Sequence, residues 1–199
     1  MPYPPEHKDE TRQRILGIAA RLFNRKGFAS VTIEEIMTEA GLTHGGFYRH
    51  FGGKDELYAE AVRQFLHKEV KEGWQLKHAK PSGSNQPFAK FVVDAYLSRD
   101  HLEDVGGSCP LIGLSSDVAR SGQPVKAAYR EVAESMIRVF QANLDGAAAR
   151  ERALVLLALC VGGMVLARSI DDDSLADELR HAARTHALMT TGWGDDRRD

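Results

Sequence analysis

The segment THGGFYRHF, residues 43–51, places aromatic and basic side chains beside two adjacent glycines. On a helical wheel of about 100° per residue, Phe47 and Phe51 fall close together and predict a buried face. The opposite face then carries His44, Gly45, Gly46, Tyr48, Arg49 and His50. An arginine can donate two hydrogen bonds to the edge of a guanine, and tyrosine and histidine suit phosphate oxygens. We therefore interpret the segment as the first turn of a helix that lies against DNA.

The glycine pair is unfavourable for a helix, since one glycine costs a helix interior about 1 kcal/mol relative to alanine. The cost is smaller in a first turn, where a missing side chain lets the backbone approach a duplex closely. The alternative is that the pair forms a loop and that the aromatic and basic residues make an ordinary solvated surface. The segment alone leaves both interpretations open.

The residues before this segment predict the helices that position it. Apolar residues recur with helical spacing between Lys8 and Lys26, and Gly27 follows in a position that ends helices. Thr32 and Glu35 then have the spacing of a capping box. They predict a second helix of two turns that ends before residue 41.

A third helix is predicted directly after a tight turn with the sequence GLT. Thr43 stands where it can cap this helix. The residue pairs at both helix starts have the spacing of a hydrophobic staple: Val31 with Ile36, and Leu42 with Phe47. Three helices in about 45 residues, the last two short and joined by a tight turn, form a helix-turn-helix unit.

Residues 11–62, TRQRILGIAARLFNRKGFASVTIEEIMTEAGLTHGGFYRHFGGKDELYAEAV, resemble the DNA-binding domain of the TetR/AcrR family of bacterial transcriptional regulators. The framework F..KGF..VTI..I...AG...G.FY.HF..K..L is present almost without gaps. The resemblance implies an all-helical homodimer that binds a palindromic operator through two such heads and usually represses. It also implies that a small molecule, bound by the C-terminal domain, releases the DNA.

The same resemblance implies a set of DNA contacts in this chain. The residues at the family's usual DNA-contacting places are Thr32, Thr43, His44, Tyr48, His50 and Lys54. Gly46 departs from the more common Thr, Ser or Ala, so one contact available elsewhere in the family is absent here.

The rest of the chain also reads as helical, so the predicted fold class is all-α. We expect a three-helix head over residues 1–54 and a larger helical domain for effector binding and dimerisation over residues 55–199. Its predicted helices are 54–79, 88–98, 111–120, 124–144, 148–169 and 174–190, with a loop at 80–87 and an irregular stretch at 99–110. Gly162 and Gly163 would let another helix come close, which suits a four-helix dimer interface. The alternative is that the last helices complete the monomer core.

Composition sets limits on location and partners. The formal net charge of −2 is unevenly spread, because residues 1–54 hold eight Lys or Arg against six Asp or Glu, and the remainder carries −4. This asymmetry is a weak sign of a polyanion-facing end. The most apolar run, residues 153–167, is too short for a membrane span of about 20 residues. The beginning of the chain lacks a signal-peptide pattern, so we expect a cytoplasmic protein with no membrane partner.

The chain is not expected to be an enzyme or to hold a cofactor or metal. It lacks a G-x-S-x-G elbow, a Gly-rich phosphate loop after a strand, and metal-ligand spacing. Cys109, in VGGSCPLIG, is the sharper of two cysteines because a loop before a helix can lower a thiol pKa. It is therefore a candidate sensor of oxidants or electrophiles, or else an ordinary small residue at a helix start. A helical adaptor that no longer reads DNA remains the alternative function.

Overall fold

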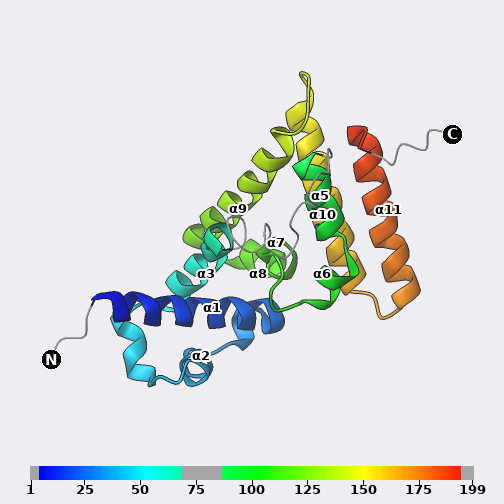
Figure 1. Ribbon diagram of the computed structural model, residues 1–199. Helices are drawn as coiled ribbons and strands as arrows, with labels where there is room; N and C mark the ends of the chain where they lie inside the picture. Colours follow the sequence, from blue (N-terminus) through cyan, green and yellow to red (C-terminus); the bar gives the residue numbers. More distant parts are fainter. Residues whose placement is uncertain (1–4, 69–86, 194–199) are drawn as a thin grey trace. The chain divides into compact units, whose positions relative to one another are not determined.

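The computed structural model describes residues 5–68 and 87–193, and their regular structure is entirely helical (Figure 1). The helices, in chain order, are α1 (Pro5–Ser30), α2 (Ile33–Glu39), the 3₁₀ helix η1 (His44–Arg49), α3 (Lys54–Lys68), α5 (Phe88–Tyr96), α6 (Arg99–Glu103), α7 (Pro110–Gly113), α8 (Ser115–Arg120), α9 (Gln123–Gln141), α10 (Ala149–Arg168) and α11 (Asp173–Thr191). The predicted all-α class is confirmed. Among the described residues, no helix combines the length and the apolar character that a membrane crossing requires.

The chain divides into two compact units. The first consists of Met1–Glu69 with Val105–Val132, and the second of Val70–Asp104 with Ala133–Asp199. The head is therefore packed with a segment that follows it by about fifty residues in the sequence. This is a division by packing, and the predicted functional boundary between residues 54 and 55 stays a prediction.

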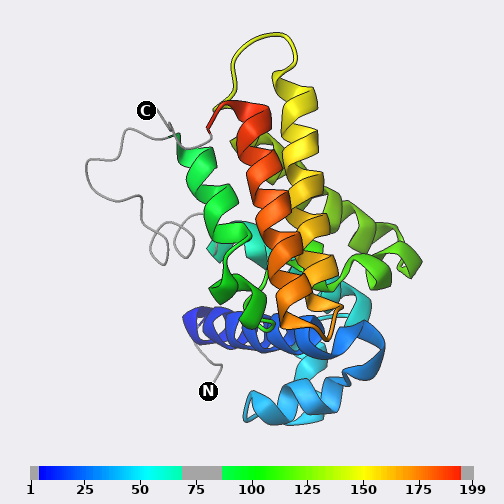
Figure 2. The same cartoon turned by 90° about the vertical axis from the view of Figure 1, so that its right-hand side faces the viewer.

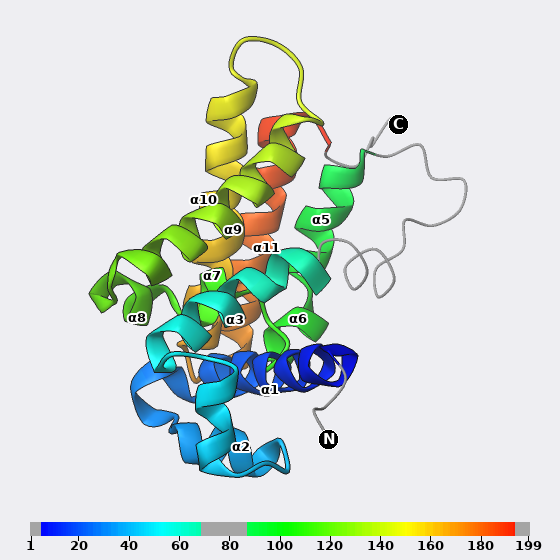
Figure 3. The same ribbon diagram turned by 90° about the vertical axis from the view of Figure 1, so that its left-hand side faces the viewer.

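The first unit is built around α1 and α3, which lie side by side, and α2 packs against both α1 and η1 (Figure 3). Its core in the head is apolar and aromatic and contains Ile15, Ala19, Phe23, Val31, Ile36, Met37, Phe47, Phe51, Leu57 and Tyr58. Burying one such large side chain stabilises a fold by about 1.5–3 kcal/mol. The short helices α2 and η1 depend on this burial, because isolated helices of that length are not stable in water.

Two glycines end the first two helices as the sequence predicts. Gly27 has a φ of 76° and interrupts the helical backbone of α1, and Gly41 has a φ of 67° directly after α2. Positive φ is costly for residues with a Cβ, which is why glycine stands at both turns.

Three expectations about helices are wrong. The third helix is a 3₁₀ helix rather than an α-helix. The predicted helix 111–120 is two short helices that meet at Leu114, and the supposedly irregular stretch 99–110 contains α6. The predicted helix 54–79 is helical as far as residue 68, while residues 69–79 and most of the predicted loop lie outside the described residues.

In the second unit, α10 and α11 run antiparallel and side by side (Figures 1 and 2). Gly163 permits this close packing, because a Cβ at that position would lie 2.7 Å from the Cβ of Ala183 in α11. Gly162 differs, since a Cβ there would meet nothing within 4 Å. The predicted close approach of helices at these glycines thus occurs within the chain at Gly163.

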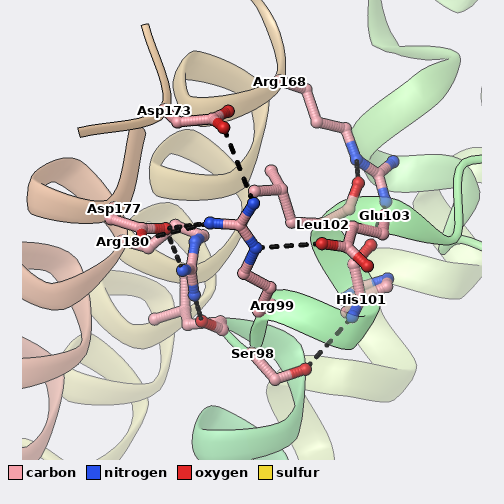
Figure 4. A network of polar contacts seen from close by, with 10 residues as sticks. Ser98, Arg99, His101, Leu102, Glu103, Arg168, Asp173, Asp177 and Arg180 are labelled. Atoms are coloured by element: carbon pink, nitrogen blue, oxygen red, sulfur yellow. Dashed lines mark hydrogen bonds and ion pairs between the residues drawn. The ribbon is translucent and has the colours of Figure 1, made fainter. Parts of the chain in front are cut away.

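The short helix α6 is held at both ends by charged and polar side chains (Figure 4). Ser98 accepts a hydrogen bond from the backbone N–H of His101 at the N-terminus of α6. Arg168, from the end of α10, donates to the carbonyls of His101, Leu102 and Asp104 at the C-terminal end of α6. Sequence periodicity could not predict α6, because its end groups are satisfied by a residue more than sixty positions away.

Arg180 links α11 to the end of α5. It is 4% exposed, donates to the carbonyl of Leu97 at 2.7 Å and pairs with Asp177 (Figure 4). Arg99 adds ion pairs to Asp173 at 3.7 Å and Asp177 at 3.3 Å. A buried guanidinium thus satisfies a carbonyl that would otherwise lack a partner.

We predict that Arg180→Met lowers the free energy of unfolding by about 1–3 kcal/mol, because it leaves the Leu97 carbonyl buried without its donor. Urea unfolding followed by circular dichroism measures this change. Arg138→Met is the matched control, since Arg138 is 67% exposed and its nearest ionic contact, to Glu134, is 4.0 Å. Its effect should stay within about 0.5 kcal/mol. Equal losses for the two variants would contradict the role given to Arg180.

Candidate nucleic-acid interface

The start of α2 is capped as the sequence predicts. Thr32 Oγ1 accepts a hydrogen bond of 3.0 Å from the backbone N–H of Glu35. The pKa of the Glu35 carboxyl is lowered, first by its hydrogen bond with Lys26 and also by the backbone N–H of Thr32. Val31 and Ile36 are both fully buried, in agreement with the predicted staple. The cap and the staple together fix the direction in which α2 leaves the turn.

Thr43 occupies the N-cap position of η1, but its side chain makes no capping hydrogen bond. The backbone carbonyl of Thr43 instead accepts from the N–H of Gly46 at 3.0 Å. The predicted position is correct and the predicted side-chain cap is absent. Thr43 is exposed, and its hydroxyl is therefore not engaged in capping the start of η1.

The helical wheel correctly predicts which aromatic side chains of this segment are buried and which are exposed. Phe47 and Phe51 are 0% and 2% exposed, and their rings stack 5.5 Å apart. Tyr48 is 60% exposed and leans edge-on against Phe47 at 5.2 Å. Two buried phenylalanines thus hold a tyrosine outward. His44 and Arg49 are also exposed.

The structure offers no internal reason for the glycines at positions 45 and 46. Neither has a positive φ. A Cβ on Gly45 would meet nothing within 4 Å, and one on Gly46 would meet Met37 and Thr43 at 3.6 Å, an ordinary contact. Side chains three apart align on a 3₁₀ helix, so the two bare positions line up with Tyr48 and Arg49.

His50 lies at the edge of the exposed surface. It is half-buried, and its Nδ1 is buried without a hydrogen-bond partner. Burial lowers the pKa of the imidazole, and the nearby charges of Lys8, Arg12 and Arg49 lower it further. The ring is therefore neutral at pH 7, within a local group of cations. Lys8 was not among the candidates chosen from the sequence, because it lies in α1, far from His50 along the chain.

Lys54 has a partner inside the protein. Its Nζ donates to the backbone carbonyl of Phe28 at 2.5 Å and lies 4.2 Å from the centre of the Phe28 ring. Burial lowers the pKa of this ammonium, while Asp55 and Asp117 oppose the shift. Its predicted DNA contact stays a prediction.

Cys109 stands directly before a helix, as the sequence predicts, but its thiol is buried. It is 1% exposed and stands at the N-cap of the four-residue helix α7. Burial, followed by the Cys109 charge, raises the pKa of the nearby Tyr129 to about 12. A reagent could reach this thiol only after local opening of the surrounding residues.

Comparison with known proteins agrees with the geometry of the head. The family model described as bacterial regulatory proteins, tetR family, matches residues 15–61. The match identifies residues 15–61 as a DNA-binding domain of the tetR type. It is 25% identical over 166 residues to the HTH-type transcriptional regulator LmrA of Bacillus subtilis, which covers 79% of this chain and 86% of that protein.

Other TetR-family relatives match over less of their length or show the shared fold. The transcriptional repressor KstR2 of Mycolicibacterium smegmatis is 32% identical over 65 residues, which is 33% of this chain and 32% of that protein. A TetR regulator from Chloroflexus aurantiacus has the same fold, with a TM-score of 0.73 at 24% identity over 92% of this chain and 95% of that one.

The head is therefore a DNA-binding helix-turn-helix domain of the tetR type, and the relative that matches over most of its length is a transcriptional regulator. The relatives of this chain are regulators rather than enzymes, which confirms the expectation that this chain is not an enzyme. In the part of the chain that the structure describes, no three His, Cys, Asp or Glu side chains gather as they would around a metal ion.

We predict that Gly45→Ala stabilises the protein and weakens DNA binding. Alanine fits the φ and the space at this position, so the free energy of unfolding should rise by about 0.4–1 kcal/mol. The added methyl group projects from the exposed surface and should obstruct a closely approaching duplex. Urea unfolding and a fluorescence-anisotropy titration with operator DNA measure the two effects.

Gly17→Ala is the matched control for this variant. A Cβ on Gly17, inside α1, would meet only the end of Arg21 at 3.9 Å, so the substitution should stabilise the helix without changing DNA affinity. Undiminished affinity in Gly45→Ala would show that the glycine serves no close approach.

Proposed function

We propose that the protein binds a palindromic operator as a homodimer, represses transcription, and releases the operator when a small molecule binds. The observation that carries the DNA-binding part is the exposed surface around Tyr48 and Arg49, which is built on the buried rings of Phe47 and Phe51. Such a surface presents donors outward from a rigid base, as reading of the major groove requires.

Within this proposal the residues divide by chemistry. Arg49 is exposed and makes no ion pair among the described residues, so its guanidinium can contact a guanine edge. Phosphate oxygens are the proposed partners of Thr32, Thr43, His44, Tyr48, His50 and Lys54. Gly45 and Gly46 allow the backbone to approach the duplex.

The first test selects bound duplexes from a random pool with the purified protein and titrates the winner at two salt concentrations. We expect an inverted repeat and a steep loss of affinity with salt. Arg49→Ala should lose about 1–3 kcal/mol mainly at the selected site, whereas Tyr48→Ala should weaken binding to all sequences alike. Equal loss on operator and random DNA for Arg49→Ala would contradict base reading. Absence of any binding at low salt would favour a helical adaptor.

The proposed dimer forms through α10 and α11. Large apolar side chains are exposed on these two helices, namely Leu154, Val155, Leu166, Leu175 and Met189. Gly162 and Leu166 are four residues apart and share a face of α10, and the open space at Gly162 suits the close approach of a helix from a second copy. A two-fold dimer would present two heads to two half-sites, as palindromic recognition requires.

We predict that Leu166→Glu converts the dimer to a monomer and weakens operator binding, because a charge in an apolar interface has no partner. Light scattering coupled to gel filtration measures the molecular mass. Val105→Glu is the control, because Val105 is also an exposed apolar residue, at 39%, but lies outside α10 and α11. If both variants kept the wild-type mass, the proposed dimer interface at Leu166 would be wrong.

Repression and effector release are proposed from the tetR-type head and from relatives such as KstR2, whose name states that it is a repressor. Because the proposed partner is operator DNA, we expect the protein to act in the cytoplasm. The effector is a small molecule of unknown identity. An electrophile acting at Cys109 is one candidate, and Cys109→Ser should then abolish DNA release by that reagent.

A further inference from the structure

The last turn of α1, residues 27–30, follows the kink at Gly27 and leads into α2. This turn is held by a side chain far from it in the sequence. The carboxylate Oδ2 of Asp117, in α8, accepts a hydrogen bond of 2.8 Å from the backbone N–H of Phe28. Lys54 Nζ binds the carbonyl of the same residue at 2.5 Å. Both backbone polar groups of Phe28 are thus bound by charged side chains, and such hydrogen bonds are roughly twice as strong as neutral ones.

The ring of Phe28 is held as firmly as its backbone. It stacks on the ring of Tyr58 with a centroid distance of 4.5 Å and an interplanar angle of 26°. Tyr58 is fully buried in α3, and Lys54 lies over the Phe28 ring. Phe28 therefore has one well-defined position as long as its charged partners stay in place.

Gly27 shows how closely Asp117 approaches this turn. A Cβ at position 27 would lie 3.0 Å from Oδ2 of Asp117. The φ of 76° at Gly27 disfavours any other residue as well. A side chain at position 27 would both strain the turn and displace the carboxylate of Asp117.

Asp117 is in turn fixed to its own helix. Its second oxygen, Oδ1, accepts a hydrogen bond of 3.0 Å from Arg120, and its backbone carbonyl accepts one of 2.8 Å from Ser121 Oγ. Val118, the next residue, is 5% exposed. The position of the carboxylate consequently follows the position of α8.

A second link joins the same two parts of the chain. The side-chain amide of Asn24, near the end of α1, donates to the carbonyls of Gly106 at 3.2 Å and Ser108 at 2.8 Å. A Cβ on Gly113 would come within 3.4 Å of the backbone carbonyl oxygen of Asn24. The end of α1 is thus attached to the segment 105–120 at several points.

We propose that Asp117 is a positioning residue for operator binding, through which α8 sets the conformation of the turn that places α2 and η1. Thr32 caps α2 only four residues after Phe28, and the buried Val31 lies between them. A shift of the Phe28 backbone therefore moves the start of α2. The packing of η1 against α2 carries the shift to Tyr48 and Arg49. This role rests on the proposed operator binding.

The test compares Asp117→Ala and Asp117→Asn with the wild-type chain. At a temperature well below the melting transition of each variant, Asp117→Ala should bind the selected operator about tenfold more weakly, as the loss of one charged hydrogen bond implies. Asp117→Asn keeps an acceptor oxygen, so its operator affinity should lie between those of the wild type and Asp117→Ala. Hydrogen exchange should accelerate at the amide of Phe28 and at the first amides of α2 in Asp117→Ala.

Two further variants separate this role from general damage to the fold. Ser116→Ala is the matched control, because Ser116 is the exposed neighbour of Asp117 and makes no side-chain hydrogen bond in the described structure. It should match the wild type in affinity and exchange. Gly27→Ala should reproduce the loss of affinity and the faster exchange of Asp117→Ala, since its Cβ displaces the same carboxylate.

Wild-type affinity in Asp117→Ala, or unchanged exchange at Phe28, would overturn the role of Asp117, even if the melting temperature fell. Failure of the wild-type chain itself to bind any duplex would instead refute the proposed function. The two failures are thus distinguished by whether the wild type or only the variants are affected.

Discussion

The exposed surface of the head depends on the burial of Phe47 and Phe51. A 3₁₀ helix of six residues, two of them glycine, has no stability of its own, since short helices in water do not compensate for the entropy of ordering the backbone. The two buried rings supply that free energy and fix the rotation of the segment about its axis. Tyr48 and Arg49 point outward for this reason, and the hydroxyl and guanidinium are displayed without having to be held by partners.

The sequence predicted those parts of the head whose causes are local. The capping pair Thr32 and Glu35 and the helix-ending glycines Gly27 and Gly41 lie next to the helix ends that they mark, so their positions in the sequence were sufficient. The distinction between an α-helix and a 3₁₀ helix at residues 44–49 was not predictable in this way. Six residues give too few turns for a period of 3.0 to differ visibly from 3.6.

Contacts between distant residues account for the other differences. The helix α6 is completed by Arg168, and the turn at Phe28 is completed by Lys54 and Asp117, which lie 26 and 89 residues away along the chain. No periodicity joins such positions. For the same reason the burial of Cys109 was not predictable from the sequence, because a Gly-rich stretch before a proline resembles a loop, whereas the surrounding helices bury the thiol. The division of the chain at residue 54 followed the helix-turn-helix pattern, and packing instead groups the head with residues 105–132.

The two adjacent glycines of α10 bear on two different properties, the packing of the subunit and its pairing with a second copy. Gly163 is required by contact with Ala183 inside the protomer, whereas the space beside Gly162 is empty. In the proposed dimer, a change at position 162 would alter the fit between subunits and leave the subunit itself intact. A bacterium that holds several related regulators could therefore keep them from forming mixed dimers by varying this single position. Partner choice can then diverge after gene duplication without any loss of folding.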